Sequence, residues 1–253
     1  MRKVNAVIFM VLALIFVSPV AATAVMSFAP EGAPSLQGYT DLLLDCFIFY
    51  PMFWNSILYA GAITIAQLLI IISCAFGFSQ SKFRGKGVLF VFYIILMMMP
   101  LQVTILPNYI GLRDMGLIDH PLGIILPMIF SPFGVVVMHQ YMKNIDNSVI
   151  EATRLETNSI LRVIFTSVIP QLRVCIFAVV LFVFADCWNM VEQPMLFLND
   201  DGLKTLSVFI TNAQKYEGAV LFPAAVIFLI PVLILYLFFN ENLEKGLTLG
   251  DLS

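Results

Sequence analysis

The chain of 253 residues is 60% hydrophobic and only 11% charged, with a mean hydropathy of +0.96. Soluble domains carry about 25% charged residues, so this composition excludes a soluble globular protein and indicates an integral membrane protein. The net charge of −3 and the isoelectric point near 5.3 give no support to nucleic-acid binding.

Six apolar stretches are long enough to cross a bilayer, which requires roughly 20 helical residues. In chain order they are residues 4–28, 53–78, 88–106, 122–142, 174–198 and 219–239. Almost nothing remains for a soluble domain, and no repeat or linker divides the chain. We therefore expect an all-α, polytopic protein with six transmembrane helices in a single domain over residues 1–253.

The first stretch has two interpretations. Arg2 and Lys3, an apolar run and the small residues at 20–24 resemble a secretory signal peptide with its cleavage site. The apolar run continues to Phe28, however, which is longer than the roughly 7 to 15 residues usual in a signal peptide. We favour a membrane span, and cleavage would leave the other five spans in place.

The basic residues predict the orientation, because loops rich in lysine and arginine stay cytoplasmic. Of the thirteen basic residues, ten fall on one side of the predicted spans, whereas Arg113, Lys204 and Lys215 fall on the other. The loops on that second side are mostly acidic. Both termini and the loop between the fourth and fifth spans are therefore predicted to be cytoplasmic.

Motifs for catalysis and metal binding are absent from the sequence. It contains no glycine-rich phosphate loop, no His-Glu-x-x-His and no nucleophile elbow. The four cysteines lack the spacing of a zinc site or a disulfide framework. We expect a non-catalytic protein with no cofactor and no metal, so any active transport would draw its energy from a partner or an ion gradient.

A polar segment lies between the fourth and fifth predicted spans. Ser148 and Glu151 have the spacing of a capping box, which predicts that a helix begins there. The chain is expected to turn at Asn158, which tolerates the left-handed conformation, and to form a second helix over residues 159–169 that ends before Pro170. The first helix is too short and too polar to span, so it needs something to contact outside the lipid.

The motif Glu151-Ala152, the acidic Glu156 and a proline nineteen residues after the first glutamate together resemble the EAA loop of ABC-importer permeases. Further matches follow in the same order along most of the chain, among them Asn55-Ser56, Met99-Pro100, Trp188-Asn189 and Gly246-Leu247-Thr248. Together they make the chain most similar to the carbohydrate-importing branch of that family, and within it to the second, shorter permease of maltose-type systems.

The resemblance implies that residues 147–170 form a coupling loop whose helix docks in a cleft of an ATPase subunit. The residues implied in this contact are Glu151, Ala152, Arg154, Leu155, Glu156, Thr157 and Asn158. The implied partners are a second homologous permease, two ATPase subunits that hydrolyse ATP, an extracytoplasmic solute-binding protein and a sugar, in a bacterial inner membrane.

Two positions depart from the family pattern. Thr153 stands where a second alanine is usual, and Thr157 stands where a glycine allows a sharp turn, although threonine disfavours positive φ. Either the turn is shifted to Asn158 or the contact with the ATPase is altered. The helix could also lie on lipid headgroups, but its mixed acidic and basic residues favour a protein partner.

A second group of candidates lies in the fifth predicted span. Asp186, Asn189 and Gln193 follow an i, i+3, i+7 pattern that predicts one polar stripe on a helix, with Trp188 and Glu192 on an adjacent face. An ionised carboxylate within a span costs roughly 2.5 to 3.5 kcal/mol, so Asp186 needs a partner, water or a proton. Pro194 frees a backbone carbonyl one turn earlier, which is typical of a broken helix near a cavity.

We expect this stripe to line the translocation path, with its polar groups bonding to sugar hydroxyls and Trp188 stacking on a pyranose ring. Gln67, and Gln102 with Thr104, are weaker candidates for the same role. Two alternatives remain open. In the first, the stripe bonds to neighbouring helices and holds the bundle together; in the second, Asp186 and Glu192 titrate in a secondary transporter driven by an ion gradient.

Overall fold

The computed structural model describes the chain except residues 1, 30–32, 213–214, 216–219 and 251–253, and the side chains of residues 2–7 and 241–250 are not described. Every regular element in the described part is a helix, which confirms the all-α prediction. The longer helices are α1 (Arg2–Phe28), α3 (Phe49–Gln80), α4 (Lys86–Met97), α5 (Leu101–Asp114), α7 (Pro132–Met142), α8 (Asn147–Glu156), α10 (Ile169–Trp188) and α13 (Leu221–Gly250). The shorter elements are α2 (Gln37–Thr40), α6 (Pro121–Met128), α9 (Ile160–Val163), α11 (Glu192–Phe197), α12 (Leu206–Thr211), the π-helical turns η1 (Asp41–Asp45) and η2 (Ile164–Val168), and the 3-10 turn η3 (Asp201–Leu203).

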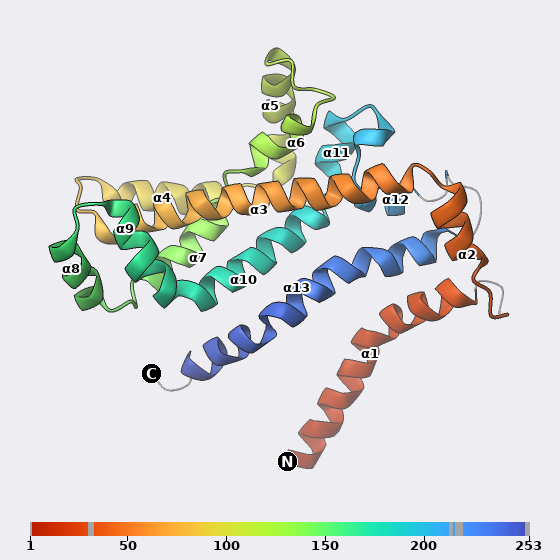
Figure 1. The fold of residues 1–253 in the computed structure, drawn as a ribbon, viewed down its shortest axis with the longest axis horizontal. Helices are drawn as coiled ribbons and strands as arrows, with labels where there is room; N and C mark the ends of the chain where they lie inside the picture. Colours follow the sequence, from red (N-terminus) through yellow and green to blue (C-terminus); the bar gives the residue numbers. More distant parts are fainter. Residues whose placement is uncertain (1, 30–32, 213–214, 216–219, 251–253) are drawn as a thin grey trace.

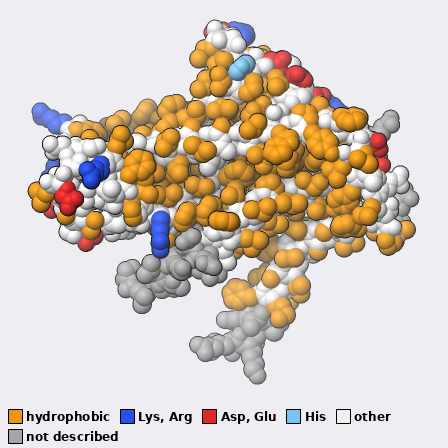
Figure 2. Space-filling view, viewed as in Figure 1, with side chains coloured by type: hydrophobic (Ala, Val, Ile, Leu, Met, Phe, Trp, Pro, Cys, Tyr) orange, Lys and Arg blue, Asp and Glu red, His pale blue; other side chains and the backbone are white. Residues whose placement is uncertain are grey.

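Helix α3 forms the axis of the bundle, because it packs on both α7 and α10. Helix α10 packs in turn on α13, and α13 contacts α1, which diverges from the bundle toward its N-terminus (Figure 1). The largest fully buried side chains include Trp188, Phe197, Phe209, Leu42 and Met52. Apolar side chains also cover much of the outer surface (Figure 2), since lipid tails are as apolar as leucine.

Five helices in the described part are long and apolar enough to cross a membrane. They are Ile8–Phe28, Phe49–Gln80, Pro121–Met142, Ile160–Trp188 and Leu221–Asn240, which lie within or overlap five of the six predicted spans. The predicted start of the sixth span at residue 219 lies outside the described residues. Apolar composition therefore located these spans correctly, and its errors concern breaks and ends.

The third predicted span, residues 88–106, is not one straight helix. Helices α4 and α5 meet at an angle of 95°, and the pair forms at most a broken span. The break falls at Met99 and Pro100, because the residue before a proline is driven out of the helical region of φ and ψ. Composition alone could not show this bend.

The fifth predicted span, residues 174–198, is shifted toward the N-terminus. The helix runs from Ile160 to Trp188, so the prediction that a separate helix ends before Pro170 is wrong. A π-helical turn precedes the proline, in which the Ile169 N–H bonds to the carbonyl of Ile164. This wider turn accommodates the proline ring and lets the helix continue.

The break between α6 and α7 leaves one carbonyl to be satisfied from outside the helix. Pro132 has no N–H for the carbonyl of Met128, four residues earlier, and the Gln67 amide of α3 donates to that carbonyl at 2.5 Å. Gln67 is 4% exposed, so this bond lies inside the bundle. Gln67 thus braces a helix break, which is the structural role left open for such polar side chains.

The break between α10 and α11 is satisfied in the same way. Pro194 has no N–H for the carbonyl of Met190, and the hydroxyls of Thr205 and Ser207 donate to that oxygen. Both hydroxyl residues are buried and lie just before or within α12. The expectation that Pro194 frees a carbonyl at a broken helix is therefore confirmed.

Replacing Gln67 by leucine removes the donor to the Met128 carbonyl while keeping a side chain of similar size. We expect the free energy of unfolding to fall by about 1–3 kcal/mol, because a buried carbonyl loses its partner. Denaturation of the purified protein in detergent measures the change. The control is Gln37→Leu, at an exposed position in α2; an equal loss in both variants would contradict the bracing role.

Candidate functional site

The N-cap of helix α8 lies two residues earlier than the capping box predicted. Its N-cap is Asp146, whose carboxylate accepts a hydrogen bond from the backbone N–H of Ser148 at 2.9 Å, so the assignment of Ser148 as the cap is wrong. The hydroxyl of Ser148, and then its N–H, hold the pKa of the Asp146 carboxyl below its usual range. A free carboxylate caps a helix N-terminus as well as a serine, which is why sequence spacing did not separate the two.

The inner face of α8 is anchored to the membrane-embedded part. Ile150 is only 1% exposed, and the Thr153 hydroxyl lies 2.6 Å from the hydroxyl of Ser167 in η2. Thr153 also donates to the carbonyl of Val149, one turn earlier. The threonine that departs from the family pattern therefore ties α8 to the helix that continues into the fifth span.

The chain leaves α8 through an extended residue. Thr157 has φ −150° and ψ 141°, and among the described residues other than glycine the positive φ belongs to Asp119. The prediction of a left-handed turn at Asn158 is therefore wrong. The Thr157 hydroxyl accepts a hydrogen bond from the N–H of Ser159, so threonine closes this turn without a strained backbone.

The outer face of α8 carries most of the residues predicted to contact an ATPase. Those that are exposed are Glu151, Ala152, Arg154, Leu155, Glu156 and Asn158, and Thr157 is half-buried. Leu155 is 91% exposed, although α8 has few other apolar side chains on its surface. Figures 1 and 2 show α8 at one end of the bundle, where lysine and arginine side chains also gather. Leu155 and Val149, which is 43% exposed, are thus apolar side chains on a mainly polar helix surface.

The polar stripe predicted for the fifth span does not form on one helix. Helix α10 ends at Trp188, so Asp186 lies in its last turn and not in the middle of a span. Asn189 follows in a non-helical conformation, with its amide donating to the carbonyl of Ala185 at 2.7 Å. Gln193 belongs to the separate helix α11. The i, i+3, i+7 spacing failed because the helix stops before it is complete.

Trp188 is a core residue. Its side chain is fully buried, its indole N–H donates to the carbonyl of Phe228 at 3.0 Å, and its ring stacks against Phe184 and Phe228. No ring face is left for a sugar, so the stacking role predicted for Trp188 is wrong for the described structure. Trp188 instead joins α10 to α13.

The remaining path candidates are divided between the surface and the core. Asp186, Asn189 and Glu192 are exposed, whereas Gln193 is buried. The Gln102 amide of α5 lies 3.5 Å from the Glu192 carboxylate, which brings together two of the predicted candidates. Within the described part of the chain, no hydrogen bond or ion pair joins Asp186 to Glu192.

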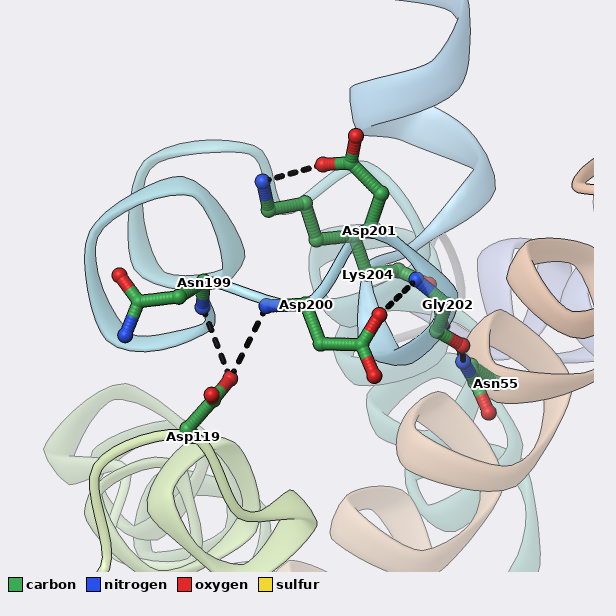
Figure 3. Close-up of polar contacts among 7 residues, drawn as sticks. All are labelled: Asn55, Asp119, Asn199, Asp200, Asp201, Gly202 and Lys204. Atoms are coloured by element: carbon green, nitrogen blue, oxygen red, sulfur yellow. Dashed lines mark hydrogen bonds and ion pairs between the residues drawn. The ribbon is translucent and has the colours of Figure 1, made fainter.

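A polar clasp at the opposite end of the bundle was missed by sequence analysis (Figure 3). The carboxylate of Asp119 accepts hydrogen bonds from the backbone N–H groups of Asn199 and Asp200, at 2.8 and 3.1 Å. Asn55 of α3 donates to the carbonyls of Gly202 and Lys204 in the same loop. The clasp joins three segments that are far apart in sequence. Its one local feature is the positive φ of Asp119, which is visible in the structure and not in the sequence.

The apolar helices and the polar structures at both ends of the bundle define a polytopic, all-α membrane protein. The family described as binding-protein-dependent transport system inner membrane component matches residues 67–249, and the chain belongs to this family. It is therefore a non-catalytic inner-membrane component of a transport system that works with a binding protein.

Curated relatives resemble the chain over most of its length. The arabinooligosaccharides transport system permease protein AraQ of Bacillus subtilis is 25% identical over 262 residues, covering 97% of this chain and 93% of the relative. The sn-glycerol-3-phosphate transport system permease protein UgpE of Brucella abortus is 25% identical over 201 residues, covering 78% of this chain and 71% of the relative.

A solved structure has the same fold. It is a chain of a bacterial ABC transporter involved in the import of the acidic polysaccharide alginate, with a TM-score of 0.83 and 21% identity over 95% of both chains. At this identity the likeness shows the fold alone.

The clasp generates a prediction about pH. Hydrogen bonds from the N–H groups of Asp200 and Asn199 lower the pKa of the Asp119 carboxyl. A lowered pKa means that the contribution of the carboxylate is complete at neutral pH and is lost only as the pH falls through the lowered pKa, in the acidic range beneath the ordinary pKa of an aspartate. The protection factors of the amides of residues 199 and 200, which compare their exchange with the intrinsic rate at each pH, should fall in that acidic range.

The variant Asp119→Asn should accelerate the same exchange several-fold at neutral pH, because a neutral amide oxygen is a weaker acceptor than a carboxylate. Asp114→Asn is the control, since that exposed carboxylate pairs with the adjacent Arg113 and lies outside the clasp. Unchanged exchange in Asp119→Asn would contradict the clasp.

Proposed function

We propose that the chain is a permease subunit of an ATP-driven ABC importer that moves a sugar or oligosaccharide into the cell by alternating access. The observation that carries the proposal is α8, a polar helix at one end of the membrane-spanning bundle, on which the side chain of Leu155 is 91% exposed. The sequence has no phosphate loop of its own, so in this proposal a partner subunit hydrolyses the ATP. The names of the relatives support a carbohydrate or a related polyol as the solute.

The coupling contact is the outer face of α8. Leu155 enters a cleft of the ATPase subunit, and Glu151, Arg154 and Glu156 pair with charged groups around it. Because Ile150 and Thr153 fix the inner face of α8, a displacement of this helix carries η2 and α10 with it. Movement of the ATPases is thereby transmitted to the transmembrane helices as rigid-body motion.

The second permease covers apolar surface that this chain leaves open. Helix α4 has no buried residue among those described, and in α5 only Leu112 is buried. The most apolar part of α1 is also unburied. These helices either face lipid or pack on a homologous permease, and the shared pathway forms between the two subunits.

In the membrane, α8 and both termini face the cytoplasm, where two ATPase subunits bind. The opposite end, with the clasp of Asp119, faces the extracytoplasmic binding protein that delivers the sugar. The positive-inside rule supports this orientation. The solute path passes the exposed Asp186, Asn189 and Glu192, next to the buried Trp188 and Gln193.

Replacing Leu155 by alanine tests the coupling contact. Burial of a leucine in a partner contributes about 1.5–3 kcal/mol, so the affinity for the ATPase subunit should fall by about tenfold to hundredfold. Copurification of the ATPase and binding-protein-stimulated ATP hydrolysis measure the loss. Leu237→Ala is the matched control, because Leu237 is 69% exposed on the apolar surface of α13.

The energy source separates this proposal from an ion-driven transporter that uses Asp186 and Glu192. In proteoliposomes containing the whole complex, uptake should require ATP inside and persist when ionophores collapse the ion gradients. Uptake that continues without ATP and stops with the ionophores would establish the alternative.

A further inference from the structure

The N-terminus of α8 takes part of its cap from another helix. Asp146 is the N-cap, and in a capping box the residue three positions later returns a side-chain acceptor to the N–H of the cap. That residue is Val149, whose side chain has no acceptor. The backbone N–H of Asp146 donates instead to Oε1 of Gln171 in α10, at 3.2 Å. Helix α8 is therefore capped by a side chain that lies 25 residues further along the chain.

The amide of Gln171 is oriented by a second hydrogen bond. Its Nε2 donates to the backbone carbonyl of Ser167 in η2, at 2.9 Å. Because that carbonyl holds the nitrogen, the amide oxygen is left to accept from Asp146, and an amide turned the other way would lose both hydrogen bonds. Gln171 therefore joins the beginning of α8 to η2 and α10.

A second contact joins α8 to the same segment. The hydroxyl of Thr153 donates to the carbonyl of Val149, so the hydroxyl of Ser167 is the donor in the 2.6 Å contact between Thr153 and Ser167. Ser167 is 3% exposed, which places this contact on the inner face of α8. Asp146 and Thr153 are about two turns apart, or about 10 Å along the helix axis. Two separated contacts fix the direction of α8 on η2 and α10, whereas one contact would let the helix pivot.

Helix α3 also reaches α8, through the last residue of α3. The amide of Gln80 donates to the side-chain oxygen of Asn147, the first residue of α8, at 3.0 Å. A single side-chain contact lets α8 pivot relative to α3, so this hydrogen bond does not fix the direction of the helix. Of these two neighbours, α10 is the one whose movement must follow that of α8.

We propose that Gln171 is a positioning residue for coupling: it makes α8 and α10 move as one body, so that a displacement of α8 by an ATPase subunit reaches the far end of α10 at Trp188. The proposal rests on the proposed transport function and adds to it a residue outside the contact surface. Gln171 acts through Asp146 and Ser167 and needs no contact with the ATPase. Without it, α8 still docks but pivots, and ATP is hydrolysed with less sugar moved.

Replacing Gln171 by methionine removes both hydrogen bonds with little change of size. The whole complex is studied in proteoliposomes, with the sugar that the wild-type complex imports fastest from a panel of neutral disaccharides and trisaccharides. Copurification of the ATPase and the rate of ATP hydrolysis should stay at the wild-type level. Since losing a hydrogen bond shifts an equilibrium by about twofold to tenfold, the sugar imported per ATP hydrolysed should fall at least about twofold.

Gln80→Met is the matched control, because it makes the same substitution and removes a hydrogen bond between α3 and α8. It should leave the ratio of sugar to ATP unchanged. An unchanged ratio in Gln171→Met, an equal fall in both variants, or loss of the copurifying ATPase in Gln171→Met overturns the proposal.

A double variant separates linking from capping. Val149→Gln supplies an acceptor three residues after Asp146, which completes a capping box within α8 but makes no link to α10. The Asp146 amide should lose protection from hydrogen exchange in Gln171→Met and regain it when Val149→Gln is added, while the ratio of sugar to ATP stays low. Recovery of the ratio would show that capping alone is needed and would overturn the linking role. Val149→Gln by itself should keep the wild-type ratio.

The failure of this proposal differs from the failure of the proposed function. If the wild-type complex shows no ATP-dependent uptake of any sugar in the panel, the proposed function itself is wrong. If the wild-type complex imports sugar and Gln171→Met does so at the same ratio, the transport function stands and only the role of Gln171 is refuted.

Discussion

The constraint on which this structure depends is that lipid offers no hydrogen bonds to a polypeptide backbone. A continuous helix meets the constraint by itself, but this chain places prolines within or beside its spans. At two breaks the carbonyl left without an N–H is satisfied by side chains from another helix: Gln67 donates to Met128, and Thr205 and Ser207 donate to Met190. Buried polar residues of a membrane protein can thus be hydrogen-bond donors to its backbone and need not contact a solute.

Hydrogen bonds and packing also fix both ends of the molecule to the spans. At one end, Thr153 and Ile150 fix α8 to the helix that begins at Ile160, and its outer face stays free. At the other end, Asp119 and Asn55 hold the loop after α11 on neighbouring helices (Figure 3). Both ends are therefore rigidly joined to the spans, which is what a subunit needs if a partner's movement at one face is to reach the other.

The candidate sites were predictable to different degrees. The polar helix was located from the sequence, because both the spacing of its polar residues and its resemblance to the family are properties of consecutive residues. The path residues were assigned on the assumption that the fifth span continues past Trp188. The structure ends that helix there, so Asp186 and Gln193 are on different helices and Trp188 is packed between aromatic rings. The clasp of Asp119 joins residues about 80 positions apart and has no local pattern.

The sequence by itself determined the membrane class, the position of most spans and the polar helix between the fourth and fifth of them, because hydropathy and helix signals are local properties. Only the tertiary structure decided where helices bend or stop, as at Pro100, and where a proline is tolerated, as at Pro170. It also decided which polar side chains brace the backbone and which join one helix to another. That outcome depends on which helix offers a donor across the bundle, a long-range relation that no pattern along the chain contains.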